Sequence, residues 1–432
     1  MKKKLLASLS VVVVLTSVVV AGAGGGGGSV EVGFSASSAS SASSVSRGEV
    51  VNEIMNFMKE RYLGEDLGEG PLGEEELCKL ACTYFYRGRY PRTITTATGE
   101  NVTIYKPLER VVVLNTDIAE TIRVLGAEGK IVGISDTIKK RPAFFPKISK
   151  RPVVGGWKEI DVEAVLQLEP DAVFAYGNWP GPEYIEEKLP PSVTVVRLDF
   201  FKPKELRDGL KTFGYFLEEE ENASKYLEWH DKYAGEIKER VAEIRERRGG
   251  RKDEPIKVFL DKSAEESVNE RKTFSEGTGM HQLCELAGGQ NIAVTAELVG
   301  TYPTVATEKI LEQDPAVIVG LSRKGGYETD DESGLKEEHE RLVGLPGFDN
   351  LTAVENERVY LIDSSVAFGP SYPVGLAYLA NWLYPEEFED LDFNLDLNPQ
   401  AILQEYLDNF CGIDFDLTKH GVFVFPGTGT EG

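Results

Sequence analysis

Aromatic residues are concentrated in short segments that follow apolar runs, where loops at strand ends are expected. Trp157 comes directly after Gly155 and Gly156, and Trp179 directly precedes Pro180. Flat aromatic side chains bind large planar or apolar ligands with little loss of conformational entropy, and a Tyr hydroxyl can bond a ligand oxygen. This pattern therefore favours binding of a bulky solute over chemical conversion of it.

Polar and charged side chains occur in the same expected loops. The candidate ligand-binding residues are Asn115, Thr116, Asp117, Trp157, Tyr176, Trp179, Tyr302, Arg323 and Tyr372. Cations that suit an anionic ligand are Lys158, Arg323 and Lys324. No dense arginine cluster accompanies them, which leaves neutral or corrinoid-like ligands open. Phe200, Phe201 and Phe368 also lie in these loops, with packing at the lobe edges as the alternative role.

Direct metal binding has one candidate group. His281 and Glu285 lie one helical turn apart with Cys284 between them, a spacing that could hold one ion. A surface or packing role explains the same residues more simply. We therefore predict no metal centre and no covalent cofactor.

Catalysis has weak support in the sequence. The chain contains no Gly-x-Ser-x-Gly, His-Glu-x-x-His or Gly-Lys-Ser/Thr motif. Asp117, Asp136 and Asp199 could serve a cell-surface hydrolase, but helix capping at Asp117 and loop hydrogen bonds at the other two explain them as well. We predict no catalytic residues and therefore no enzyme.

Composition narrows the range of partners. The 432 residues carry 71 acids against 47 Lys and Arg, a net charge of −24. Such a chain repels phosphate backbones, which argues against nucleic acid as a partner. Hydrophobic residues at 41% and charged residues at 27% are values of globular proteins. Four Cys are too few for a disulfide-rich scaffold.

The first residues have the pattern of an export segment. Lys2, Lys3 and Lys4 precede an apolar run over 5–21, and a glycine string follows. Residues 35–46 are nearly all Ser and Ala, as in a flexible tether. We expect an extracytoplasmic protein that is either secreted or held at the membrane by its N-terminal segment.

Alternating apolar strands and amphipathic helices predict an α/β fold with parallel sheets. Residues 162–175 match 307–320 without a gap, each copy being a helix that ends before a proline and leads into a buried strand. The offset is that of a whole domain, which predicts two similar lobes. Between them, 222–248 has helical spacing and would extend about 40 Å as one rod, with an interruption near 218–221.

These patterns divide the chain as follows. The expected parts are an export signal or anchor (1–28), a tether (29–48), a helical segment (49–89), an N-terminal α/β lobe (90–203), a connecting helical region (204–250), a C-terminal α/β lobe (251–390) and a tail (391–432).

An ordered set of segments resembles the solute-binding proteins of ABC importers for iron chelates, haem and cobalamin, of archaeal type. The segments are 90–104, 107–112, 115–126, 132–136, 154–157, 169–171, 287–292 and 359–363. The resemblance covers roughly residues 90 to 390.

The resemblance implies two Rossmann-like lobes joined by one long helix, with a ligand cleft between them. It also implies an iron(III) chelate or corrinoid as the transported ligand, and an ABC permease with its ATPase as partner. In this family a glutamate on each lobe docks on the permease; Glu120 matches the first position, and Glu285, or alternatively Gln282, the second. A hydrolase or an adhesive surface protein on the same two-lobed scaffold is the alternative.

Overall fold

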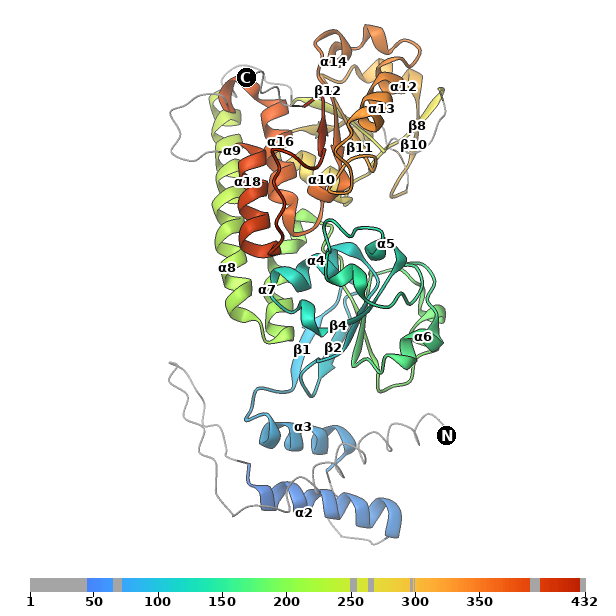
Figure 1. The fold of residues 1–432 in the computed structure, drawn as a ribbon, viewed down its shortest axis with the longest axis vertical. Coiled ribbons are helices and arrows are strands. Elements are labelled where there is room, and N and C mark those ends of the chain that lie inside the picture. Colours follow the sequence, from blue (N-terminus) through green and yellow to red (C-terminus); the bar gives the residue numbers. More distant parts are fainter. Residues whose placement is uncertain are drawn as a thin grey trace.

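Two α/β lobes lie end to end beside a column of long helices (Figure 1). The computed structural model describes residues 45–64, 72–248, 255–262, 268–295, 298, 300–388 and 397–427. The export segment and most of the tether expected from the sequence lie outside these residues. In the described part of the chain, no helix has the length and apolar character needed to cross a membrane.

The N-terminal lobe is built on a four-stranded parallel sheet with the order β4-β3-β5-β6. Its strands are β3 (Val111–Val113), β4 (Ile131–Ile134), β5 (Ala172–Ala175) and β6 (Thr194–Arg197). β3 and β5 are buried along their whole length, as expected for strands covered on both faces. An antiparallel hairpin of β1 (Arg92–Thr95) and β2 (Asn101–Ile104) precedes the sheet. Its helices are α4 (Thr116–Val124), α5 (Asp136–Lys139) and α6 (Val162–Gln167).

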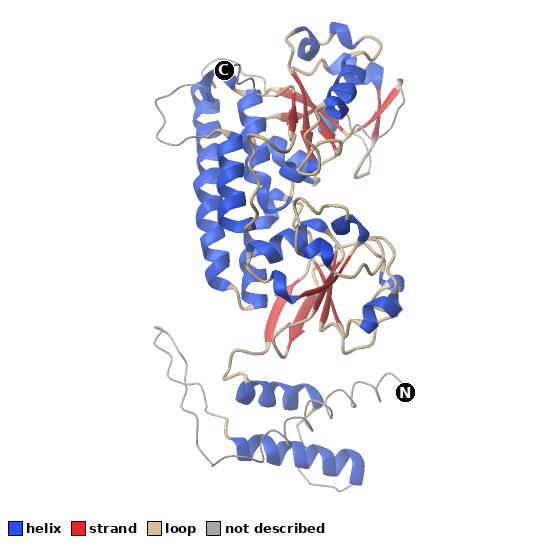
Figure 2. Ribbon diagram, in the orientation of Figure 1, coloured by secondary structure: helices blue, strands red, loops and turns tan. Residues whose placement is uncertain are grey.

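The C-terminal lobe contains a five-stranded sheet with the order β13-β12-β11-β7-β9. Its strands are β7 (Lys257–Asp261), β9 (Gln290–Asn291), β11 (Val317–Ser322), β12 (Val359–Asp363) and β13 (Val424–Phe425), of which β13 alone is antiparallel. A separate antiparallel pair is formed by β8 (Glu270–Lys272) and β10 (Thr304–Ala306). Figure 2 shows that strands occur only within the two lobes.

Helices surround the C-terminal sheet and continue into the column. They are α10 (Gly279–Leu286), α11 (Ile292–Thr295), α12 (Thr307–Gln313), α13 (Ser333–Val343), α14 (Thr352–Glu355), α15 (Ser364–Ala367), α16 (Tyr372–Leu383) and α17 (Pro385–Phe388).

A nearly continuous helix connects the lobes. α7 (Pro203–Leu217) ends at Glu218, whose φ of 64° is left-handed, and α8 (Glu220–His230) then runs through a π-helical turn (Asp231–Gly235) into α9 (Glu236–Arg248). Residues 220–248 extend about 43 Å at 1.5 Å per residue. The rod and its interruption near 218–221 are confirmed, as are the two parallel-sheet lobes.

The last residues return to the lobes. α18 (Pro399–Tyr406) and a π-helical turn (Leu407–Cys411) pack beside the column, and β13 then pairs with β12 at the sheet edge. Sequence patterns assign no role to this tail. Its aromatic residues explain the packing, because Tyr406 and Phe410 contact Trp229 of the connecting helix, with ring centroids 5.2 and 5.7 Å away.

A helical hairpin precedes the N-terminal lobe. It consists of α2 (Arg47–Met58), a π-helical turn (Lys59–Leu63) and α3 (Glu74–Phe85), and it has its own small core. A capping box between Ser46 and Glu49 begins α2. Cys78 and Cys82 are half-buried free thiols on α3.

Candidate ligand site between the lobes

Four aromatic side chains of the N-terminal lobe form a continuous cluster, here called the aromatic wall. Trp157 meets Tyr176 edge to face with ring centroids 6.0 Å apart, and it meets Trp179 at 6.3 Å. Tyr176 in turn meets Phe201 at 5.8 Å. Three of the four were predicted ligand residues, and the structure brings them together.

The wall is placed by the ends of the parallel strands. Tyr176 directly follows β5 and Phe201 follows β6, and the carboxyl ends of parallel strands meet at one edge of the sheet. Trp157 follows a tight turn at Gly155, whose φ is 109°. A Cβ at Gly155 would lie 2.7 Å from the carbonyl oxygen of Glu159, so only glycine fits there.

Cations lie on the faces of the wall. The Lys158 ammonium is 4.8 Å from the ring centroid of Trp157 and 5.7 Å from that of Trp179. The Lys202 ammonium lies 5.5 Å from the Phe201 centroid and 3.2 Å from the Asp199 carboxylate. An ammonium over an indole face is attracted by the ring quadrupole. The wall is therefore both aromatic and positively charged.

The C-terminal lobe contributes an opposing group around Tyr302. Its ring, 47% exposed, meets Phe274 edge to face at 5.7 Å, and the Lys262 ammonium lies 4.7 Å from its centroid. Burial raises the pKa of Tyr302, and the charges of Arg323, Asp199 and Lys202 also act on it. Two of these charges belong to the N-terminal lobe, so the two groups face each other across the junction.

Arg141 is a cation at this junction that the sequence analysis missed. Its charge acts on Tyr176 and Glu120 of its own lobe and on Asp363 of the other. It is half-buried, and its guanidinium makes no hydrogen bond or ion pair within the described residues. The sequence feature that could have revealed Arg141 is the absence of Asp and Glu from residues 137–158.

The start of α4 carries buried polar atoms without partners. Asn115 is 1% exposed, and neither its amide nitrogen nor its amide oxygen has a hydrogen-bond partner in the described structure. Oδ2 of Asp117 accepts a hydrogen bond from the Phe200 backbone N–H at 3.1 Å, while Oδ1 accepts none. Burial raises the pKa of Asp117 to about 7. Unpaired buried polar groups cost about 1–3 kcal/mol each.

One expectation about these residues needs correction, namely that Asp117 caps α4. Asn115, and not Asp117, is the N-cap of α4, and its side chain makes no capping bond. Phe200 is buried against Phe213 at 5.4 Å, so packing accounts for it. Thr116 begins α4 and is half-buried.

A further contact between the lobes is here called the inter-lobe latch. Phe144 stacks on Tyr327 with ring centroids 4.2 Å apart and ring planes 11° apart. The Glu328 carboxylate accepts hydrogen bonds from the backbone N–H groups of Ala143, at 3.0 Å, and Phe144, at 3.2 Å. Arg123 packs against the latch, with its guanidinium 4.0 Å from the centroid of the Phe144 ring.

Two α/β lobes on a connecting helix, with binding groups facing each other across the junction, are the architecture of a binding protein. A family model described as periplasmic binding protein matches residues 111–366. The chain belongs to this family. Its members bind substrates and are not enzymes, and they are extracytoplasmic.

Curated relatives of this periplasmic binding protein bind several kinds of solute. The molybdate-binding protein MolA of Haemophilus influenzae is 25% identical over 338 residues, which cover 71% of this chain and 89% of MolA. A cobalamin-binding protein of Halobacterium salinarum is 28% identical over 236 residues, covering 53% of this chain and 58% of that protein.

Solved structures share the fold. A TroA-like periplasmic binding protein from Veillonella parvula, named FepB, has a TM-score of 0.60 at 23% identity and covers 77% of this chain and 99% of its own. A periplasmic haem-binding protein from Pseudomonas aeruginosa has a TM-score of 0.52 at 21% identity, covering 65% and 94%. At these identities the likeness concerns the fold alone.

Two residues that were expected to contact the ligand or the permease are buried in this periplasmic binding protein. Tyr372 is 1% exposed, and its hydroxyl bonds Nε2 of His230 at 2.7 Å within the helix column. Glu120 is 5% exposed and accepts a hydrogen bond from the Tyr406 hydroxyl at 2.6 Å. Neither side chain is open to a ligand or a permease, because the connecting helix packs on Tyr372 and the C-terminal tail packs on Glu120.

The remaining candidates stay at the surface or in the core. Glu285 has a 43% exposed side chain that pairs with Lys204 at 2.8 Å and His281 at 3.1 Å. Cys284 is fully buried, and the described residues contain no group of three potential metal ligands. Arg323 and Lys324 are exposed, while Phe368 packs against the core.

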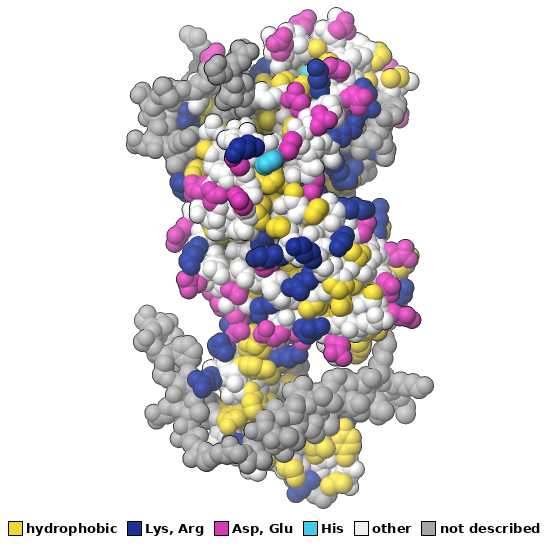
Figure 3. Space-filling view, viewed as in Figure 1, with side chains coloured by type: hydrophobic (Ala, Val, Ile, Leu, Met, Phe, Trp, Pro, Cys, Tyr) yellow, Lys and Arg dark blue, Asp and Glu magenta, His cyan; other side chains and the backbone are white. Residues whose placement is uncertain are grey.

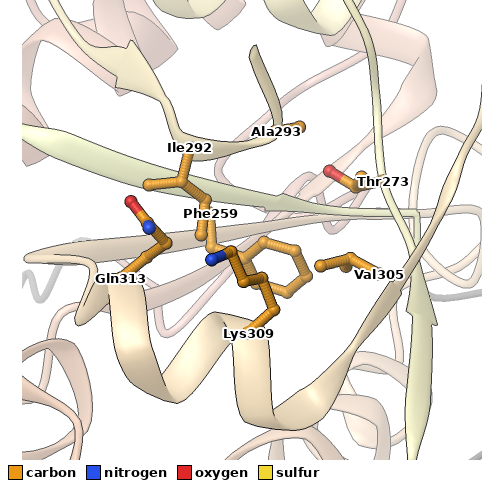
Figure 4. Close-up of a pocket in the computed structure, with 7 residues that line it drawn as sticks. All are labelled: Phe259, Thr273, Ile292, Ala293, Val305, Lys309 and Gln313. Atoms are coloured by element: carbon orange, nitrogen blue, oxygen red, sulfur yellow. The ribbon is translucent and has the colours of Figure 1, made fainter. Parts of the chain in front are cut away.

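A small cavity lies away from the junction, inside the C-terminal lobe (Figure 4). It is lined by Phe259, Thr273, Ile292, Ala293, Val305, Lys309 and Gln313, and its volume is about 10 Å³. That volume holds about one water molecule, so this cavity is no ligand site.

Proposed function

We propose that this binding protein captures an anionic metal chelate between its two lobes and delivers it to an ABC permease and its ATPase. An iron(III) chelate is the leading ligand, and a corrinoid or haem is the alternative. The ligand is carried unchanged, so no residue acts as a catalyst.

The observation that carries this proposal is the combination of the aromatic wall with unpaired cations. Trp157, Trp179 and Tyr176 offer broad flat faces, and Lys158 lies against two of them. Arg141 adds a guanidinium whose donors are free within the described residues. Planar rings beside unpaired cations suit a large ligand that carries negative charge. Without Arg141, the sequence patterns leave neutral or corrinoid-like ligands open.

The relatives support the size and kind of ligand. Among them are proteins named for molybdate, cobalamin and vitamin B12. An ion as small as molybdate would contact only a small part of a broad aromatic wall, so we favour the larger metal complexes.

Delivery would take place outside the cytoplasm. The basic and apolar start of the chain, followed by a Ser/Ala tether, supports export with retention at the membrane as one possibility and secretion as the other. With Glu120 buried, Glu285 is the remaining candidate for contact with the permease.

Ligand titration followed by tryptophan emission tests the proposal. Ferric citrate, ferric tris-catecholate, haemin and cyanocobalamin would be added separately to the purified protein. We expect saturable quenching by at least one iron complex, reduced in Trp157→Phe, lost when Trp179→Phe is added because both rings belong to the aromatic wall, and kept in Trp229→Phe, because Trp229 is 4% exposed within the helix column. Absorbance at the emission wavelength would be corrected with free tryptophan.

Two outcomes contradict the proposal. Saturable binding of none of the four compounds would reject a metal complex as ligand. Quenching that persists in Trp157→Phe but disappears in Trp229→Phe would place the ligand outside the lobe junction. Native mass spectrometry of material co-purified from the source cells would identify the complex directly.

A further inference from the structure

One segment of this acidic chain is free of acids. Residues 137–158 contain no Asp or Glu, although the chain as a whole carries 71 acids in 432 residues, so about four would be expected. The seven cations of the segment are Lys139, Lys140, Arg141, Lys147, Lys150, Arg151 and Lys158. We call residues 137–158 the basic strip.

Most cations of the basic strip are exposed, and several lack partners. Lys140 pairs with Asp136 at 2.7 Å and Lys147 with Glu128 at 2.6 Å. Lys139, Lys150 and Arg151 are exposed and make no side-chain hydrogen bond or ion pair within the described residues. Figure 3 shows Lys and Arg gathered on the face of the N-terminal lobe near the other lobe, where Figure 1 places α4 and α5.

The fold holds the strip rigidly. Phe145 and Ile148 are buried in the core of the lobe. Val153 forms a parallel bridge with Ile134 at the carboxyl end of β4, and the Asp136 N–H donates to the Gly155 carbonyl at 2.9 Å. The exposed cations are therefore fixed on one surface and are not part of a loose loop.

The strip leads from the outer surface to the proposed ligand site. Its last residue, Lys158, lies over Trp157 and Trp179. Arg141, near its start, lies at the junction of the lobes, where its charge acts on Tyr176 and Asp363. The same short segment thus supplies both surface cations and cations of the site.

We propose that the basic strip is an electrostatic collecting surface that draws the anionic ligand toward Trp157 and Arg141. The proposal rests on the proposed function and adds a role for residues that do not touch the bound ligand. A protein of net charge −24 repels an anion at long range. A fixed positive surface at the site raises the local anion concentration and the association rate. Charges act over about 8 Å at physiological ionic strength, so the effect is local and sensitive to salt.

Collisional quenching of tryptophan by small ions tests the potential without requiring the ligand. Iodide, caesium and acrylamide would each be added to the full chain at low and high salt. Trp229 and Trp382 are 4% and 5% exposed, whereas Trp179 is 49% exposed, so quenching reports mainly on the wall. The test variant is Lys139→Gln/Lys150→Gln/Arg151→Gln. The control, Lys79→Gln/Lys211→Gln/Lys225→Gln, removes equal charge from α3, α7 and α8.

We expect the test variant to reduce the iodide quenching constant roughly twofold at low salt, to raise the caesium constant and to leave acrylamide unchanged. The control should alter iodide quenching little, and high salt should abolish the difference. Equal effects of both variants would mean that only net charge matters and would overturn the proposal. An unchanged iodide constant in the test variant would also overturn it. Altered acrylamide quenching would reveal a change of fold, and single substitutions would then replace the triple variant.

Stopped-flow association of ferric tris-catecholate gives a second readout. The test variant should lower the association rate and its dependence on salt while leaving the dissociation rate unchanged. A change in the dissociation rate alone would make these residues direct ligand contacts and would contradict a collecting role. If neither this chelate nor the other three compounds bind, the proposed function fails, and the iodide experiment still decides whether the strip attracts anions.

Discussion

Phe144 of the N-terminal lobe stacks on Tyr327 of the C-terminal lobe, with ring centroids 4.2 Å apart. Both rings are buried, and Phe415 and Phe423 of the C-terminal tail lie behind Tyr327 at 5.3 and 4.8 Å. A ligand bound as proposed would therefore enter the junction on another side, or this contact would open.

Removing the Phe144 ring should destabilise the whole protein. Phe144→Ala deletes a buried aromatic ring and should lower the free energy of unfolding by about 3–5 kcal/mol in urea denaturation. Tyr327→Phe is the matched control, because the Tyr327 hydroxyl is buried without a partner and its loss should cost less than about 1 kcal/mol. A large loss in Tyr327→Phe would show that the hydroxyl has a hydrogen bond that this packing does not provide.

Gly369 should resist substitution because it faces Glu120. Its φ is 71°, and a Cβ there would lie 2.9 Å from Oε2 of Glu120. Gly277 has a similar φ of 81° with nothing within 4 Å, so Gly277→Ala measures the backbone cost alone. We expect Gly369→Ala to lower the melting temperature more than Gly277→Ala, by the equivalent of about 1–3 kcal/mol of overpacking. Equal effects would show that α4 moves aside freely.

Burial of Glu120 should make stability depend on pH. Burial raises the pKa of Glu120 from 4.5 to about 7. The unfolded chain loses this proton near pH 4.5 and the folded chain only near pH 7, so Glu120 lowers stability progressively across that window. Glu120→Gln can still accept the hydrogen bond from Tyr406 and should flatten the decline by at most about 3 kcal/mol.

Urea unfolding at pH 5 and pH 8 measures this effect. Asp117, whose pKa burial also raises to about 7, contributes a decline of the same sign that remains in Glu120→Gln. Glu285 is the comparison of opposite sign, because Lys204 and His281 lower its pKa despite partial burial. An identical pH dependence in the unmodified protein and in Glu120→Gln would contradict a buried, mostly protonated Glu120.

Arg141 should control how long the ligand stays bound. A hydrogen bond to a charged group contributes about 1.5–3 kcal/mol, so Arg141→Gln should weaken binding of an anionic ferric chelate about 10- to 100-fold. The loss should appear mainly as faster dissociation in stopped-flow displacement. Arg245→Gln, an exposed substitution on α9, should bind normally. Normal affinity in Arg141→Gln would remove this residue from the site.

The repeated unit was predictable because its signal is local. Glu169 and Asp314, paired in the sequence repeat, share a left-handed backbone with φ of 45° and 44°, and each directly precedes a proline and a buried strand. Apolar runs bounded by such breaks predicted β5 at its observed residues. Tyr176 of the aromatic wall followed from the same logic, because it comes directly after β5.

The other site residues depended on contacts that sequence patterns do not reveal. Glu120 and Tyr372 were assigned by their place in expected elements, but partners far along the chain bury them: Tyr406 for Glu120 and His230 for Tyr372. Arg141 lies in an irregular segment between α5 and the following turn, where neither periodicity nor a strand end marks it. Only the packing of the two lobes shows which of the many cations faces the junction.

The hydrogen bond between Tyr406 and Glu120 joins positions 286 residues apart. During synthesis, the face of α4 that carries Glu120 therefore stays uncovered until almost the entire polypeptide has been made. Such long-range closure slows folding. The last turn of helix to emerge would then be the one that completes the first lobe.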